Sequence, residues 1–275
     1  MDIVAVGFLG LVLGSFVNAL VWRLHEQGKR HKKALKVPSE DLSILHGRSM
    51  CPDCHHTLAP RDLVPVFSWL LLHGRCRYCK KPISPQYPLI ELLTAVLFLV
   101  GYVSWPYGHD VSGTIQLIFF GIYIVFFMAL AVYDTRWFLL PDRLVFPVIG
   151  VTIVELLVKV LLHGDIMTLW SAIMSVAVIY GLFWGLYQVS RGEWIGGGDV
   201  KLAIALGVIV GSPVHALLVI FLASLLGTVV SVPLVLRGKS GLAQHIPFGP
   251  YLLASCFIVV LYADRVIAWY QHSLL

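Results

Sequence analysis

The sequence predicts an all-α polytopic membrane protein with about eight transmembrane helices and a small cytoplasmic zinc-binding domain between helices 1 and 2. Three observations support this fold class. Of the 275 residues, 58% are hydrophobic and 13% are charged, whereas about a quarter of the residues in soluble domains are charged. Apolar runs long enough to cross a bilayer recur along the chain. The one long polar stretch contains two Cys pairs with the spacing of metal ligands.

Eight apolar runs give the expected spans in chain order. They cover residues 3–22, 88–105, 114–133, 144–162, 167–189, 199–211, 213–236 and 247–270. The first run has an acidic residue before it and no small-residue cleavage site after it, so we interpret it as a retained helix and not a signal peptide. The sixth run is short and ends at Gly211, Ser212 and Pro213. Short segments of this kind typically line a cavity in a membrane protein, and a kinked helix is the alternative.

Basic residues predict the orientation of the chain. The polar stretch 23–86 carries 12 of the 20 Lys and Arg residues, and cytoplasmic loops are the ones enriched in these residues. With this stretch in the cytoplasm, 18 of the 20 lie on that side, Lys159 and Arg265 lie toward the other, and both termini are outside. The expected parts are a first transmembrane helix (1–22), a cytoplasmic tetracysteine domain (23–86) and a seven-helix membrane catalytic domain (87–275). The net charge of +5 then reflects orientation, so we expect membrane lipid and no nucleic acid as partners.

Two Cys pairs in the polar stretch predict a metal site. Residues 51–54 read CPDC and residues 76–79 read CRYC, with 21 residues between the pairs. Four thiolates at this spacing suit one tetrahedral Zn²⁺ with Zn–S distances of ~2.3 Å, and a reducing cytoplasm disfavours disulfides. A site filled by four protein ligands is structural rather than catalytic. The alternative is two unrelated thiol pairs. The predicted ligands are Cys51, Cys54, Cys76 and Cys79.

Two aspartates stand at the predicted cytoplasmic ends of helices. Asp134 directly follows the third span, and Asp199 directly precedes the sixth. If these two helices pack together, the carboxyl groups meet at one membrane depth. One can then act as general base on a water while the other, protonated, polarises a carbonyl, which is the chemistry of aspartic proteases. The alternative is that each is a charge at a helix end, where Asp199 would suit the positive end of the helix dipole.

Three glycines precede Asp199 in the stretch WIGGGDVKL. Without side chains, they leave room for a substrate backbone to approach the carboxylate, and a flexible turn is the alternative. They are not a dinucleotide-binding loop, because no strand precedes them and no βαβ unit follows. The glycines are Gly196, Gly197 and Gly198.

Other polar residues in apolar surroundings have simpler expected roles. Asp142 stands at the start of the fourth span, where we expect it to cap the helix. Asn18 and Glu91 lie inside apolar runs, where we expect hydrogen bonds between helices. Lys201 is expected to extend toward lipid headgroups.

Six motifs in order resemble one family, the type IV prepilin leader peptidases, which are bifunctional peptidase/N-methyltransferases of the aspartic type. They cover nearly the whole chain: GSFVNALVWRL (14–24), CPDC with CRYC, ISPQYPLIELLTAVLF (83–98), YDTRWFLLPD, GGGDVKL and IPFGPYL (246–252). The resemblance assigns the two catalytic aspartates to Asp134 and Asp199. The stretch 25–46 departs from it, because it looks longer and more basic than the family pattern.

The resemblance implies an intramembrane aspartic endopeptidase in a bacterial inner membrane. Its substrates would be type IV prepilins or type II secretion pseudopilins, cleaved after a Gly at the cytoplasmic membrane face. The family then methylates the new N-terminal residue with S-adenosylmethionine, but the sequence does not locate a site for this methyl donor.

Two functions from other classes fit part of the sequence. A polytopic transporter would account for the short sixth span and the acidic residues, although both aspartates lie at one interface rather than at the midplane. A membrane zinc-finger adaptor would account for the cysteines and would leave the paired aspartates unexplained.

Overall fold

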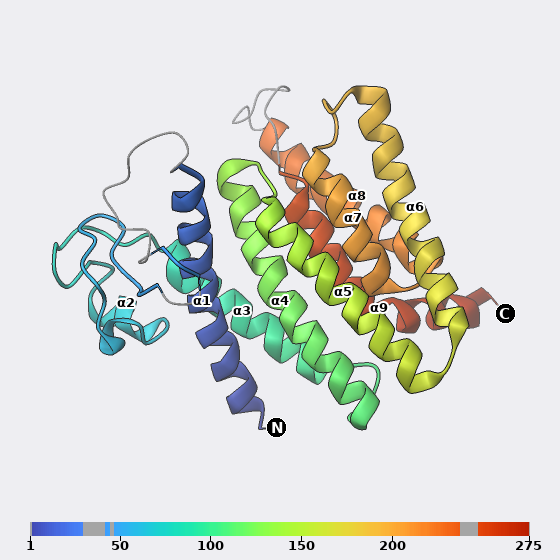
Figure 1. Ribbon diagram of the computed structural model, residues 1–275, viewed down its shortest axis with the longest axis horizontal. Helices are drawn as coiled ribbons and strands as arrows, with labels where there is room; N and C mark the ends of the chain where they lie inside the picture. The colour runs from blue at the N-terminus through green and yellow to red at the C-terminus, as the bar shows by residue number, and fades with distance from the viewer. Residues whose placement is uncertain (1, 30–41, 45–46, 237–246, 275) are drawn as a thin grey trace. The chain divides into compact units, whose positions relative to one another are not determined.

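The computed structural model describes residues 2–29, 42–44, 47–236 and 247–274 (Figure 1). Much of the basic stretch 25–46 and the loop 237–246 lie outside the described residues. The described part of the chain is helical, with two isolated β-bridges and no strand, so the all-α prediction is confirmed. The chain divides into two compact units, Met1–Val103 and Ser104–Leu275, which are called unit 1 and unit 2 below.

Unit 1 contains two long helices and a compact polar region. Its elements are α1 (Ile3–Lys29), the 3-10 helix η1 (Pro60–Asp62), α2 (Phe67–Leu71) and α3 (Gln86–Val103). α1 and α3 approach closely, because a Cβ on Gly10 would lie 2.6 Å from the Cα of Ala95. Small residues permit such close helix packing in membranes. As expected, Asn18 joins the two helices, since its Nδ2 donates to the carbonyl of Tyr87 at 3.1 Å.

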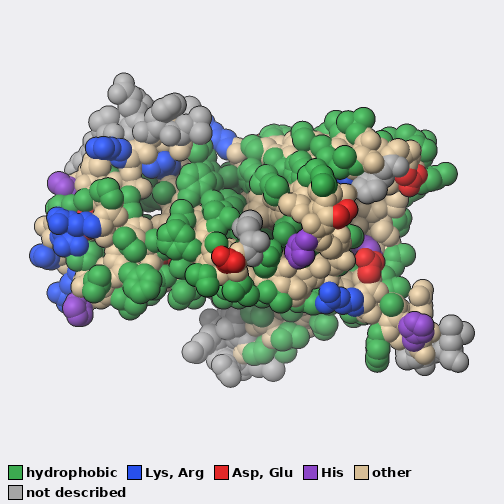
Figure 2. Space-filling model, turned by 90° about the horizontal axis from the view of Figure 1, so that it is seen from below, with side chains coloured by type: hydrophobic (Ala, Val, Ile, Leu, Met, Phe, Trp, Pro, Cys, Tyr) green, Lys and Arg blue, Asp and Glu red, His purple; other side chains and the backbone are tan. Residues whose placement is uncertain are grey.

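Unit 2 contains six helices that lie side by side in Figure 1. They are α4 (Val111–Trp137), α5 (Asp142–His163), α6 (Ile166–Ser190), α7 (Gly197–Val210), α8 (Pro213–Leu236) and α9 (Gly249–Leu274). Counting both units, seven of the described helices are long and apolar enough to cross a membrane: α1, α3, α4, α5, α6, α8 and α9. Their outer surfaces carry many exposed large hydrophobic residues, as Figure 2 shows for one face.

α7 is the short sixth segment that the sequence predicts. Its 14 residues extend ~21 Å at 1.5 Å per residue, less than the ~30 Å hydrocarbon core. Gly211 ends it with a φ of 62°, a conformation that favours glycine. α7 packs on α5, α6, α8 and α9 and is buried along most of its length, with Leu202 and Leu206 fully enclosed. The segment is therefore an inner helix of unit 2, surrounded by longer ones.

Candidate active site and metal centre

Asp134 lies in the last turn of α4. The sequence had indicated a position directly after the helix. Its side chain is only 6% exposed, and its Oδ2 accepts a hydrogen bond from the backbone N–H of Gly249 at 3.1 Å. Gly249 is the first residue of α9, where the backbone N–H groups have no partner within the helix. One of these free donors therefore holds the carboxylate in place.

Asp199 is the third residue of α7 and interacts electrostatically with Asp134. Its carboxylate accepts a backbone hydrogen bond from Gly196, the residue that precedes the helix. Its Oδ1 is buried and has no hydrogen-bond partner among the described residues. A buried oxygen without a partner is costly, so this atom is suited to bind a water, a proton or a substrate group.

Two helices, α5 and α9, contact both of the helices that carry the aspartates. The sequence indicated that the two carboxyl groups meet if their helices pack together, and in the structure α4 and α7 both pack against α5 and α9. α9 contributes the N–H that binds Asp134, and the segment just before α5 contributes Leu140. The acidic pair is thus built from four helices of unit 2.

Two glycines at the site are required by close packing, Gly249 against Asp134 and Gly198 against Leu140. A Cβ on Gly249 would lie 2.6 Å from Asp134 Oδ2 and 3.6 Å from Leu140 Cδ2. A Cβ on Gly198 would lie 2.8 Å from Leu140 Cβ. Neither approach allows a side chain, because real Cβ contacts are longer. The role of Gly249 was not predicted; its signal was the Gly-Pro pair at the start of the last apolar run.

The other two glycines before Asp199 are more open. Gly196 and Gly197 are exposed, and a Cβ on Gly197 would meet only Tyr187, at 3.8 Å. Leu140 fills the space beside Gly198. The predicted substrate approach therefore stays a prediction for all three glycines, of which the first two are exposed and meet neighbours only at ordinary contact distances.

Asp142 has a different role from the one expected. Asp142 is the first residue of α5, after Pro141, and its side chain does not cap the helix. It accepts instead from Lys201 Nζ at 2.7 Å, and this ammonium also lies 5.5 Å from the centre of the Phe146 ring. The prediction of a capping Asp142 is therefore wrong, because its carboxylate pairs with Lys201 instead. The expected extension of Lys201 toward lipid headgroups stays a prediction.

The four predicted metal ligands come together in unit 1. The sulfur atoms of Cys51, Cys54, Cys76 and Cys79 all lie within 4.8 Å of one another. Cys51 Sγ and Cys79 Sγ are 3.9 Å apart, close to the ~3.8 Å edge of a tetrahedron with ~2.3 Å Zn–S bonds. The donor set and its dimensions therefore fit a tetrahedral Zn²⁺ ion.

The two Cys pairs share one local conformation, repeated 25 residues apart. Antiparallel bridges close each turn, Met50 with Thr57 and Arg75 with Pro82. The residue after the second Cys of each pair has a positive φ, 57° at His55 and 61° at Lys80. The same backbone turn thus presents both thiol pairs.

Backbone N–H groups set the acidity of the buried thiols. Burial alone raises the pKa of Cys76, but hydrogen bonds from the backbone of Cys79 and Tyr78 lower it to about 7. Burial raises the pKa of Cys51 to about 12. The turn around Cys76 therefore stabilises the thiolate form that a metal requires.

Asp62 ties η1 to the second Cys turn. Its carboxylate accepts from Arg77 Nε at 2.7 Å, from the Tyr78 hydroxyl at 3.0 Å and from the Ala59 N–H at 3.2 Å. Burial raises the pKa of Asp62, and these hydrogen bonds together lower it below its ordinary value. The charged carboxylate is thus part of the native fold of this region.

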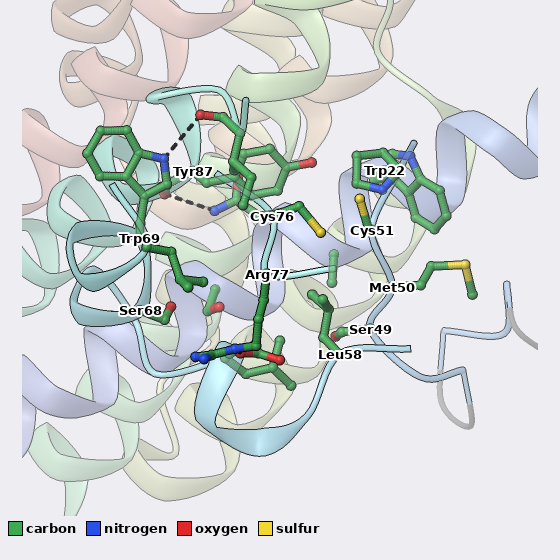
Figure 3. Close-up of a pocket in the computed structure, with 18 of the residues that line it drawn as sticks. Trp22, Ser49, Met50, Cys51, Leu58, Ser68, Trp69, Cys76, Arg77 and Tyr87 are labelled. Carbon is green, nitrogen blue, oxygen red and sulfur yellow. Dashed lines mark hydrogen bonds and ion pairs between the residues drawn. The ribbon is translucent and has the colours of Figure 1, made fainter. Parts of the chain in front are cut away.

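Unit 1 also contains a cavity of about 140 Å³ beside the metal centre (Figure 3). Aromatic side chains of Trp22, Trp69 and Tyr87 line it, together with Arg77 and Glu91. Trp69 is held in place by a hydrogen bond from its Nε1 to the carbonyl of Ile83 at 3.1 Å. A cavity of this kind can take an aromatic or cationic ligand.

The family follows from two sequence matches. The model described as "Bacterial Peptidase A24 N-terminal domain" matches residues 8–105, and the model of the type IV leader peptidase family matches residues 121–232. The chain belongs to the type IV leader peptidase family. The predicted family and enzyme class, a leader peptidase with N-methyltransferase activity, are therefore confirmed, and the transporter and adaptor alternatives are set aside.

Relatives match almost the full length of the chain. A protein of Aeromonas salmonicida (strain A449) is 33% identical over 277 residues, covering 96% of this chain and 92% of the relative. One of Stutzerimonas stutzeri is 33% identical, with 95% and 91% covered, and one of Neisseria gonorrhoeae is 34% identical, with 94% and 90% covered. Each is named "Prepilin leader peptidase/N-methyltransferase". No solved structure matches the chain.

Proposed function

We propose that this multi-pass membrane enzyme removes the leader peptide of type IV prepilins or type II secretion pseudopilins. Cleavage follows a Gly at the cytoplasmic face of the bacterial inner membrane, and the enzyme then N-methylates the new N-terminal residue. The names of the relatives support the substrate class. The distribution of 18 of 20 basic residues supports the membrane side.

The paired aspartates carry the peptidase proposal. Asp134, held by the Gly249 N–H, is the better placed of the two to stay ionised and to take a proton from a water. Asp199, whose Oδ1 lacks a partner, is the better placed to hold a proton and donate it to the substrate carbonyl. Attack of the water on that carbonyl gives a tetrahedral intermediate. Its C–N bond then breaks as the proton taken up by Asp134 passes to the leaving amine, and the proton on the former carbonyl oxygen returns to Asp199.

The proposed arrangement assigns a role to each part of the chain. Residues 1–22 form the first membrane helix, 23–86 form a cytoplasmic domain with a structural Zn²⁺, and 87–275 form the membrane catalytic domain with both termini outside. The dimensions of the four-thiol cluster support the metal. When bound, Zn²⁺ joins two turns of a polar region too small to be stable through its own apolar core.

Replacing either aspartate by Asn tests the peptidase proposal. We expect Asp134→Asn and Asp199→Asn each to lower cleavage of a co-expressed prepilin about a thousandfold or more, because the pair acts as one unit. Asp142→Asn is the matched control, since Asp142 pairs with Lys201 and not with the dyad. Mass spectrometry of the pilin N-terminus reports cleavage and methylation together. Full cleavage by both variants would refute the dyad.

We propose the cavity of unit 1 as the site of the methyl donor. S-Adenosylmethionine supplies an electrophilic methyl group on a sulfonium, and aromatic faces with the Glu91 carboxylate suit such a cation. We expect Trp22→Leu to weaken binding of S-adenosylhomocysteine, measured by calorimetry, about tenfold. Trp170→Leu, on the exposed surface of unit 2, should leave binding unchanged. Unchanged affinity in Trp22→Leu would place the donor elsewhere without affecting the peptidase proposal.

A further inference from the structure

We propose that residues 63–72, which include α2, are an interfacial anchor that inserts apolar side chains into the surface of an anionic bilayer. This role is separate from cleavage and methylation, and it does not depend on either. The segment reads LVPVFSWLLL and lies within the most basic part of the sequence. The name anchor segment is used below for residues 63–72.

The anchor segment exposes an apolar face. Phe67 is 62% exposed, Leu70 55% and Leu71 78%, and Val64, in the loop before α2, is also exposed. Ser68, Trp69 and Leu72 lie on the other side, where they line the cavity of unit 1. Large exposed apolar residues grouped in this way mark a surface that binds an apolar partner.

A hydrogen bond to α3 fixes the position of the anchor segment along that helix. Val66 N–H donates to Glu91 Oε2 at 2.7 Å, and Glu91 is the sixth residue of α3, ~7.5 Å along the helix from Gln86. Val66 has a φ of 61°, which a β-branched residue adopts only when its surroundings enforce it. The position of the anchor segment against α3 is therefore tightly determined.

The length of α3 indicates that Glu91, and with it the anchor segment, lies at the membrane surface. The 18 residues of α3 extend ~27 Å, so the whole helix is needed to cross a hydrocarbon core of ~30 Å. Glu91 then lies just inside the boundary between the lipid headgroups and the hydrocarbon core. Interfacial helices insert their apolar faces ~5–10 Å at this boundary, the depth at which the anchor segment is held.

Charge favours lipid as the occupant of the apolar face. Arg61, Arg75 and Lys80 flank the anchor segment in the sequence, are exposed and form no ion pair with an acidic residue in the described part of the chain, whereas Arg77 and Lys81 are paired. In Figure 2, Lys and Arg side chains gather beside hydrophobic ones on the side where Figure 1 labels α2. Basic residues beside an apolar helix face are typical of binding to anionic lipid.

Exposed residues of α3 extend the apolar surface into the bilayer. Leu89 and Leu92 are about half exposed, one on each side of Glu91 in the sequence. α3 is apolar enough to span the membrane, so this surface faces lipid tails. The anchor segment adds a second apolar surface at the same end of α3, where the chain enters the bilayer.

Photocrosslinking in lipid nanodiscs tests the occupant directly. A benzophenone amino acid replaces Leu71, or Asp53 as an exposed control in the first Cys turn, in the full-length chain with its metal content checked. We expect lipid adducts at position 71 about fivefold or more above those at position 53 in discs with anionic lipid. Adducts to unit 2, to a second copy or to a pilin helix, or no excess over the control, would overturn the proposal.

Hydroxyl-radical footprinting extends the test to the unmodified chain. In anionic nanodiscs, Phe67 and Leu71 should be protected to the level of Leu89 in α3, whereas Tyr78, 38% exposed in the same polar region, should be oxidised. Oxidation of Phe67 and Leu71 at least as strong as that of Tyr78 would show that the face meets water and would refute the anchor. Footprinting uses the unmodified chain, so its result does not depend on the folding of any variant.

Discussion

At the residue scale, the candidate side chains of the two sites stand out in the sequence, whereas their backbone partners do not. Carboxylates and thiols are rare in an apolar chain, so Asp134, Asp199 and the four cysteines stand out by position and spacing. Gly249 holds Asp134 through a main-chain N–H, which every residue other than proline also has. A backbone donor has no sequence signature of its own, and only the fold reveals it.

Gly249→Ala tests this backbone contact. A Cβ at 2.6 Å from Asp134 Oδ2 must displace the carboxylate, so we expect kcat for leader cleavage to fall about a hundredfold or more with KM little changed. Gly181→Ala in α6 is the control, because a Cβ there meets nothing within 4 Å and Ala favours a helix. Equal cleavage rates for the two variants would contradict the assigned role of Gly249.

At the element scale, hydrophobic runs predicted where helices exist but not where they end. α1 continues to Lys29, beyond the predicted end at residue 22, and α4 continues to Trp137, so Asp134 is a helical residue. Helix hydrogen bonding continues past the last apolar residue, and hydropathy does not detect this. η1 and α2 were not predicted, because neither is long enough to show a periodic pattern.

Because the two Cys turns meet at one cluster, we predict that both turns are needed to bind zinc. Cys51→Ser and Cys76→Ser should each lower bound zinc from one per chain toward zero, because the two turns meet at a single cluster. Cys256→Ser, which removes a buried thiol in α9 far from this cluster in the sequence, should keep the metal. Elemental analysis of the purified chains measures this. A full complement of zinc in either turn variant would refute the ligand set.

At the scale of the whole molecule, the arrangement of charge around the helices predicts orientation. The chain divides into one unit with the four-thiol cluster and one with the acidic pair. The number of membrane crossings was harder to predict. α7 has the composition of a span, but its 14 residues are too few to cross alone, and its enclosure by four helices follows from packing that no linear pattern encodes.

Reporter fusions test the predicted orientation. A fluorescent protein that folds only in the cytoplasm should stay dark when fused after Leu275 and should fluoresce when inserted at Gly192, in the turn between α6 and α7. Alkaline phosphatase, active only outside the cytoplasm, should give the opposite pattern at both positions. Fluorescence at the C-terminus would overturn the placement of both termini outside.

The shortness of α7 also constrains how the enzyme is made. A 14-residue segment is a poor substrate for independent insertion, so α7 should enter the bilayer only together with its longer neighbours. Ser171 of α6 donates to the carbonyl of Gly211 at 2.7 Å, which satisfies the buried turn once α6 is in place. The Gly249 N–H that binds Asp134 is synthesised last, because it belongs to α9. If the proposed dyad is correct, Asp134 therefore gains this hydrogen bond only after α9 has been synthesised and has packed against α4.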